Sequence, residues 1–131
     1  MKKRIIQPAS LPDPRPRYNQ GLLTEGGRLL FIAGQTAVDA SGAVVGKGDI
    51  EKQAEQVFEN VGAVLREAGA SFEHLVMTTT YLTDISQRAA FQRVRTKYFN
   101  ADWPPTSTFV VVRSLANADL LIEIAGIAVI P

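Results

Sequence analysis

The run Leu120–Ile130 near the end of the chain is apolar at even and odd positions alike, and Glu123 is its one charged residue. Successive side chains of a β-strand point to opposite faces, so this run predicts a strand that is covered on both faces. A charge left unpaired in such a place costs about 3–5 kcal/mol. Two interpretations of Glu123 remain open. Either the carboxylate is paired or lies at a fraying strand edge, or it is kept for chemistry and moves a proton or holds a water.

Composition limits the class of protein. The chain has 131 residues, which predicts a single domain over residues 1–131 with a sizeable core. Fourteen basic and thirteen acidic residues leave a net charge of +1, so the broad positive field of a nucleic-acid-binding protein is missing. The sequence has no cysteine, which excludes disulfides, thiolate zinc sites and cysteine nucleophiles.

The beginning of the sequence does not resemble an export signal. Only two apolar residues follow the basic start before Gln7 and Pro8. No stretch reaches the roughly 20 apolar residues that span a bilayer. We therefore expect a cytoplasmic protein without a membrane partner.

The first third of the chain predicts a loop and then a hairpin. Four prolines between Pro8 and Arg17 predict a loop, because proline fixes φ and has no amide proton to donate. Residues 20–24 and 28–33 carry strand-forming side chains on either side of Glu25-Gly26-Gly27, which predicts a β-hairpin with a tight glycine turn.

The remainder predicts two helices and further strands. Apolar residues three and four apart between Asp49 and Gly69 predict a helix, with Asp49 as its N-cap and Gly69 as its C-terminal stop. A second helix opens at Ser86 and ends before a loop that begins at Asn100. The predicted strands are 74–83, 106–113 and 120–130, with a continuation of the sheet at 36–40. The connection 114–119 is short enough to make the last two strands antiparallel neighbours.

This order of elements predicts an α+β fold, with about six strands in one mixed sheet and both helices on one face. Two helices cover only one face, yet the last two predicted strands are apolar on both. Exposed apolar faces usually mark partner surfaces, so we predict a homo-oligomer. Glu123 would then lie beside a subunit interface, where clefts for small ligands often form.

Several segments of the sequence, spread nearly from end to end, are informative when taken together. They are Tyr18-Asn19-Gln20, Leu30-Phe31-Ile32-Ala33-Gly34-Gln35, Ala68-Gly69-Ala70, Thr80-Tyr81-Leu82-Thr83-Asp84, and Pro104-Pro105-Thr106 running on to Glu123-Ile124-Ala125-Gly126-Ile127-Ala128. With these segments the chain resembles the reactive intermediate deaminase family, also called RidA or YjgF. The resemblance implies a chorismate-mutase-like α+β barrel, assembled as a homotrimer with three clefts between subunits.

The resemblance also implies an activity. Family members with deaminase activity hydrolyse reactive enamines and imines, such as 2-aminoacrylate, to a ketoacid and ammonia, without a metal or organic cofactor. The family's glutamate falls on Glu123 and its tyrosine on Tyr18, which would pack against or hydrogen-bond the ligand. A protonated imine carbon is already electrophilic, so the protein needs only to position a water and manage one proton.

Two positions depart from the family pattern. An arginine two residues beyond a proline holds the substrate carboxylate in the deaminases, and counting from Pro105 places Ser107 there. The family's serine before the glycine of the hairpin strand is Ala33. Arg17 could supply the missing charge or be an ordinary solvated residue. We therefore predict a substrate other than 2-aminoacrylate, Glu123 as the catalytic residue, and substrate-binding residues Tyr18, Ala33, Gly34, Ser107 and Arg17.

Three functions remain open. The favoured one is a small-molecule hydrolase that acts on an imine or enamine. The second is a ligand-binding or interaction trimer without deaminase chemistry, which Ser107 and Ala33 support. The third is a ribonuclease or translation inhibitor, a role attached to some family members, but the balanced charge and the single histidine weigh against it. His74 has no second ligand at metal spacing, so no metal site is expected.

Overall fold

The computed structural model describes residues 1–99 and 101–131, so Asn100, where the predicted loop begins, lies outside the described residues. Its described residues form six strands and two α-helices, with three strands before the first helix and two after the second. In chain order they are β1 (Lys2–Ile6), β2 (Gly21–Glu25), β3 (Arg28–Thr36), α1 (Ile50–Glu67), the 3₁₀ turn Phe72–His74, β4 (Leu75–Leu82), the 3₁₀ turn Ile85–Gln87, α2 (Arg88–Arg95), β5 (Thr106–Val111) and β6 (Ile122–Ile130).

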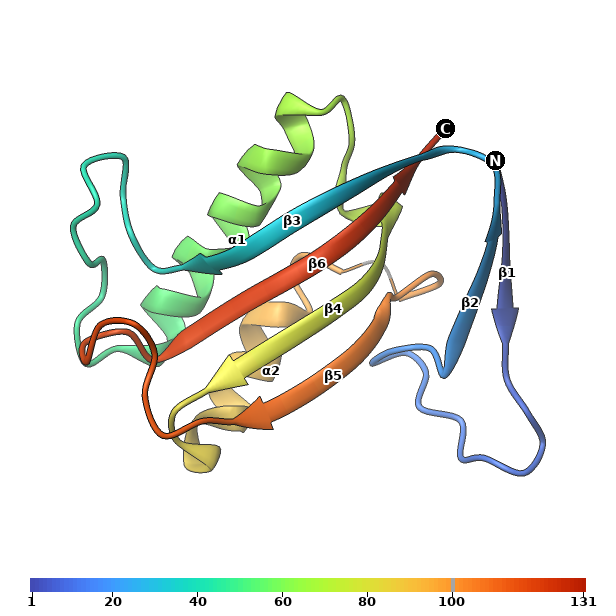
Figure 1. Ribbon diagram of the computed structural model, residues 1–131. Helices are drawn as coiled ribbons and strands as arrows, with labels where there is room; N and C mark the ends of the chain where they lie inside the picture. Colours follow the sequence, from blue (N-terminus) through green and yellow to red (C-terminus); the bar gives the residue numbers. More distant parts are fainter. Residues whose placement is uncertain (100) are drawn as a thin grey trace.

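Four of the six strands form one sheet in the order β3-β6-β4-β5. β6 lies between β3 and β4 and is antiparallel to both, whereas β5 is parallel to β4. Figure 1 shows α1 and α2 together behind this sheet, with the opposite face left open. The predicted α+β class, the six strands and the two helices on one face are confirmed, but the prediction of one six-stranded sheet is wrong, because β1 and β2 pair with each other in a separate sheet. Within the described residues, no helix is both long and apolar enough to cross a membrane.

The prediction that the last two strands are antiparallel neighbours is wrong. β4 separates them, with β5 on one side and β6 on the other. β6 is apolar on both faces and takes a central place in the sheet. β5 follows α2, and a strand reached through a helical crossover pairs in parallel with the strand before the helix. The short connection therefore passes across the end of β4 instead of forming a hairpin.

The prediction of a hairpin between residues 20–24 and 28–33 is also wrong. β2 pairs instead with β1, from Lys2 opposite Glu25 to Ile6 opposite Gly21, in a separate two-stranded sheet. We call residues 2–25 the N-terminal arm, and Figure 1 shows it standing apart from the main sheet. Gly26 and Gly27, with φ of +74° and +84°, carry the chain from the arm into β3. Residues 2–6 were not predicted as a strand, and they supply the partner that β2 takes.

Helix α1 begins and ends where its capping residues predict. The Asp49 side chain accepts a hydrogen bond of 3.1 Å from the Lys52 amide, and Gly69 follows the helix with a φ of +75°. The apolar face of α1 packs on the sheet, and Phe58 stacks on Tyr98 at 4.8 Å and on Phe91 at 6.1 Å between ring centroids. These rings fasten α1 to α2 behind the sheet.

One polar side chain of α1, Gln53, is fully buried and ties the helix to the beginning of β6. Its amide nitrogen donates to the carbonyls of Gly46 and Asp119, at 3.1 and 2.8 Å. Its amide oxygen accepts from the Leu121 amide at 2.8 Å. Three backbone groups from two loops are thus satisfied by one side chain, which fixes where β6 starts.

Replacement of this side chain tests that anchoring. We expect Gln53→Leu to lower the free energy of unfolding by about 2–4 kcal/mol, because buried backbone groups lose their partners. Urea denaturation measures the change. The control is Gln56→Leu on the same helix, where one bond to Asn60 of 2.9 Å is lost, and a loss of about 1 kcal/mol or less is expected. Equal losses in the two variants would contradict the anchoring role.

Candidate functional site

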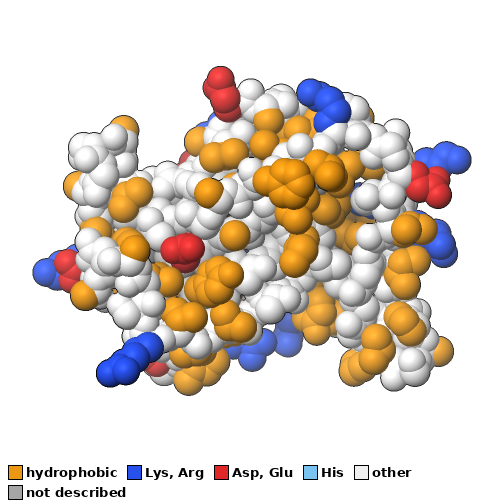
Figure 2. All heavy atoms as spheres, in the orientation of Figure 1, with side chains coloured by type: hydrophobic (Ala, Val, Ile, Leu, Met, Phe, Trp, Pro, Cys, Tyr) orange, Lys and Arg blue, Asp and Glu red, His pale blue; other side chains and the backbone are white. Residues whose placement is uncertain are grey.

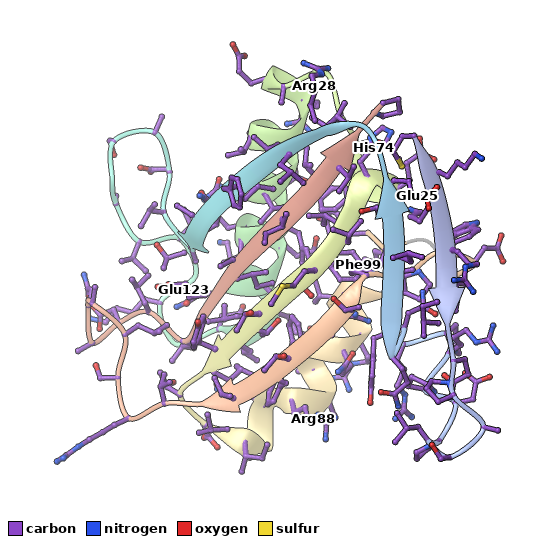
Figure 3. All side chains as sticks on the ribbon, turned by 45° about the vertical axis from the view of Figure 1, so that its right-hand side comes forward. Glu25, Arg28, His74, Arg88, Phe99 and Glu123 are labelled. Carbon is purple, nitrogen blue, oxygen red and sulfur yellow. The ribbon has the colours of Figure 1, made fainter. Side chains whose placement is uncertain are left out.

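Glu123 is the second residue of β6 and lies between Thr36 on β3 and Tyr81 on β4. Its neighbours Ile122 and Ile124 are buried toward the helices, so strand alternation places Glu123 on the open face of the sheet. Figure 3 shows it near the start of β6. The side chain is half-buried, and it makes no hydrogen bond or ion pair with any residue that the structure describes. The interpretation of Glu123 as a paired, structural carboxylate is therefore not supported by any partner within the described chain.

Gly34 lies against this carboxylate. The register of β3 on β6 shifts between Ile32 and Gln35, so Ala33 and Gly34 form an irregularity in the strand. A Cβ at Gly34 would overlap the carboxylate oxygen of Glu123 and lie 2.7 Å from Cδ. The missing side chain therefore leaves the space that the Glu123 carboxylate occupies. Three predicted site residues, Ala33, Gly34 and Glu123, come together here.

The open face around Glu123 is apolar. It exposes Phe31 by 70%, Leu29 by 62%, Met77 by 43% and Val110 by 36%. Figure 2 views this face and shows hydrophobic side chains grouped over the sheet, with few charged groups among them. Apolar groups of this size are seldom left in water on a monomeric protein, so this surface has the character of an interface.

The other predicted residues gather elsewhere. Arg17, Tyr18 and Ser107 line a cavity of about 600 Å³ between the proline-rich loop of the N-terminal arm, helix α2 and strand β5. Asn19 holds this loop in place with two hydrogen bonds. Its buried side-chain amide donates to the Pro104 carbonyl at 2.7 Å, and its backbone N–H donates to the Pro105 carbonyl at 3.2 Å.

Ser107 lies on the helix side of the sheet. It shares that side of β5 with Phe109, whose ring is 6.1 Å from that of Phe91 on α2. Glu123 is on the opposite face, so one chain does not bring Ser107, Tyr18 and Arg17 together with Glu123. No group of three histidine, aspartate or glutamate side chains in the described chain is placed to hold a metal.

Two threonines on β5 were missed by the sequence reasoning. Thr106 and Thr108 alternate with Ser107 and so lie on the same face as Glu123. Thr106 donates to the Val76 carbonyl at 2.7 Å, while Thr108 is exposed. Counted from Pro104 rather than Pro105, the position two residues beyond the proline is Thr106. The sequence signal that could have identified them is the alternation of side chains along β5, which puts every second residue on the same face.

The arrangement defines a small α+β protein in which an open, apolar sheet face carries a carboxylate that has no partner among the described residues. Residues 9–130 match the family model described as Endoribonuclease L-PSP, and the chain belongs to this family, the RidA/YjgF family. It is 41% identical over 132 residues to a RutC family protein of Synechocystis, covering 100% of this chain and 99% of that protein. It is 28% identical over 125 residues to the human 2-iminobutanoate/2-iminopropanoate deaminase, covering 95% of this chain and 90% of that protein.

Solved structures agree with the fold. A Rid protein of Yersinia pestis, YyfB, has a TM-score of 0.88 and 34% identity, covering 99% of this chain and 100% of that one. RidA from an Antarctic Psychrobacter has a TM-score of 0.72 and 29% identity, covering 97% of this chain and 99% of that one. The fold is thus the chorismate-mutase-like fold of Rid proteins, as the resemblance implied.

The contact between Gly34 and Glu123 leads to a prediction about geometry. We expect Gly34→Ala to displace the Glu123 carboxylate, with a loss of unfolding free energy below about 1 kcal/mol, because the flexible end of the glutamate can move aside. In Gly126→Ala, the Cβ would meet the Met77 carbonyl oxygen at 3.1 Å. Backbone cannot move aside so easily, so we expect a loss of about 1–3 kcal/mol there. Urea denaturation and crystal structures check both; an unmoved Glu123 in Gly34→Ala would contradict the geometry.

Proposed function

We propose that this chain is a cytoplasmic hydrolase that converts a reactive imine or enamine to a carbonyl compound and ammonia. The observation that carries the proposal is the Glu123 carboxylate, unpaired among the described residues and fitted against Gly34 on an apolar face. Membership of the RidA/YjgF family and the similarity to a human protein named as an iminobutanoate deaminase support the same chemistry.

In the proposed reaction, Glu123 manages water and one proton. As the water oxygen bonds to the carbon of the protonated imine, the π electrons of the C=N bond move to nitrogen, and Glu123 takes a proton from the water. The carboxyl group then gives this proton to the nitrogen of the tetrahedral carbinolamine. The C–N bond breaks, ammonia leaves, and the remaining hydroxyl gives its proton to the Glu123 carboxylate as the carbonyl forms.

The substrate class follows from β5. Neither Thr106 nor Ser107 carries the positive charge that would hold a substrate carboxylate with two parallel hydrogen bonds. On the face of Glu123, Thr106 and Thr108 offer only neutral hydroxyl groups. The proposed substrate is therefore an imine that, unlike 2-aminoacrylate, has no carboxylate to be held by β5. It binds between the hydroxyl groups of β5 and the apolar side chains of the open face.

The site also requires other copies of the chain. We propose that the open face packs against neighbouring subunits in a homotrimer, so that the cleft beside Glu123 is closed by a second copy. The large exposed apolar side chains of β3, among them Leu29 and Phe31, support this arrangement. Closure would exclude bulk water and strengthen the electrostatic effect of the carboxylate.

Hydrolysis of freshly generated imines tests the chemistry. We expect the wild type to accelerate ammonia release and Glu123→Gln to lose at least about 100-fold in rate, the lower range for a general acid–base residue. The matched control is Glu67→Gln, an exposed residue at the end of α1, which should keep the wild-type rate. Imines with and without a carboxylate should be compared, and the latter should react faster.

Two results would contradict this function. If the Glu123→Gln variant kept the wild-type rate, the carboxylate would have no part in the mechanism. If the wild type accelerated no imine, the chain would instead be a ligand-binding trimer without deaminase chemistry, which the absence of an arginine at residues 106 and 107 favours as the second candidate.

The assembly is tested separately. We expect Phe31→Lys to shift the protein toward monomer, because a charge would replace an apolar side chain inside the proposed interface. Light scattering after size-exclusion chromatography measures the mass. Ile85→Lys is the control, since Ile85 is a large exposed side chain, 59% accessible, on the connection to α2. A wild type that stays monomeric at micromolar concentration would overturn the trimer.

A further inference from the structure

The cavity between the proline-rich loop and α2 is rich in arginine. Four guanidinium groups line it, those of Arg15, Arg17, Arg88 and Arg95. Arg15 is paired with Asp13, the one acidic residue of the lining, by a contact of 2.5 Å. No ion pair formed by the other three arginines is found among the described residues. The cavity therefore carries an excess of positive charge.

Arg95 is the most constrained of these groups. Its side chain is on α2, and the residue is only 5% exposed. Its Nη2 atom is buried and has no hydrogen-bond partner among the described residues. The guanidinium carbon lies 4.4 Å from the centre of the Phe99 ring, which fixes its plane. Burial lowers the pKa of Arg95 to about 10, so the group keeps its charge at neutral pH.

Further donors face the same space. Arg88 lies with its guanidinium carbon 5.3 Å from the centre of the Phe109 ring, and Figure 3 shows it on α2 at the lower edge of the molecule. Tyr18 and Ser107 add two hydroxyl groups to the lining. Guanidinium groups offer planar pairs of N–H donors that match the two oxygens of a carboxylate or phosphate.

We propose that this cavity is a binding site for a small ligand that carries a carboxylate or phosphate group, held by Arg95 with Arg17 and Arg88. A buried cation without a partner is destabilising, and an anion in contact with it would offset that loss. The volume of about 600 Å³ lies within the range of small-molecule sites.

This site is separate from the proposed hydrolase site within one chain. Ser107 marks the helix side of the sheet, whereas Glu123 and Gly34 lie on the open side, and neither of them lines the cavity. The binding test below uses no enzymatic readout, so its failure would leave the proposed function untouched.

The test measures binding of inorganic phosphate and of pyruvate to the full chain by isothermal titration calorimetry in chloride buffer. We expect saturable binding of at least one of them, weakened at least tenfold in Arg95→Met. The matched control is Arg93→Met on the same helix, because Arg93 is exposed and pairs with Glu51 at 3.0 Å outside the cavity. This control should bind within twofold of the wild type.

A second measurement is the melting temperature with and without each anion. Arg95→Met should melt above the wild type in chloride buffer without phosphate or pyruvate, because a buried charge that has no partner among the described residues is replaced by an apolar side chain. It should also lose the rise that the anion gives the wild type. If Arg95→Met does not fold, Arg88→Ala at the exposed side of the cavity serves in its place, with the same expected tenfold loss.

The two probes distinguish the ligand's chemistry. Tighter binding of phosphate assigns a phosphate-bearing ligand, and tighter binding of pyruvate assigns a carboxylate. Absence of saturable binding for both anions would overturn the proposal, as would binding by Arg95→Met equal to that of the wild type.

Discussion

The pairing of β6 with both β3 and β4 is the constraint on which the rest of the molecule depends. One face of β6 gives Ile122, Ile124 and Ala128 to the core under α1, and the other face carries Glu123. The hydrogen bonds of Gln53 fix where the strand begins. The irregularity in β3 then brings Gly34 beside the carboxylate. A strand at the edge of the sheet could not have been flanked in this way on both sides.

Features that depend on nearby residues were predictable from the sequence. Capping of α1 by Asp49 and Gly69 needs only a few adjacent residues, and the two-faced apolar run around Glu123 is a property of one strand. The pairing of strands was predicted less well because it depends on segments far apart in the chain. β1 gave no strong strand signal, yet it takes β2 away from β3, and β4 separates the two strands that the short connection joins.

The candidate site, too, was predictable in its residues but not in how the fold arranges them. The family resemblance named Glu123, Tyr18 and Ser107, but a list of residues does not say on which face of a sheet each one lies. Pro104-Pro105 allows two ways of counting to the position where the resemblance implies an arginine, and these differ by one residue. A shift of one residue along a β-strand moves a side chain to the other face of the sheet. Ser107 lies on the helix side with Phe109, whose ring is 6.1 Å from that of Phe91, whereas Thr106 and Thr108 lie on the open side.

The prolines of the N-terminal arm have a consequence for recognition. Pro12, Pro14 and Pro16 form part of the wall of the arginine-lined cavity. Each pyrrolidine ring restricts the backbone before folding as well as after it, so less conformational entropy remains to be lost when this wall becomes ordered. A ligand would contact a rigid, pre-organised surface, and little of its binding free energy would be lost in ordering the loop.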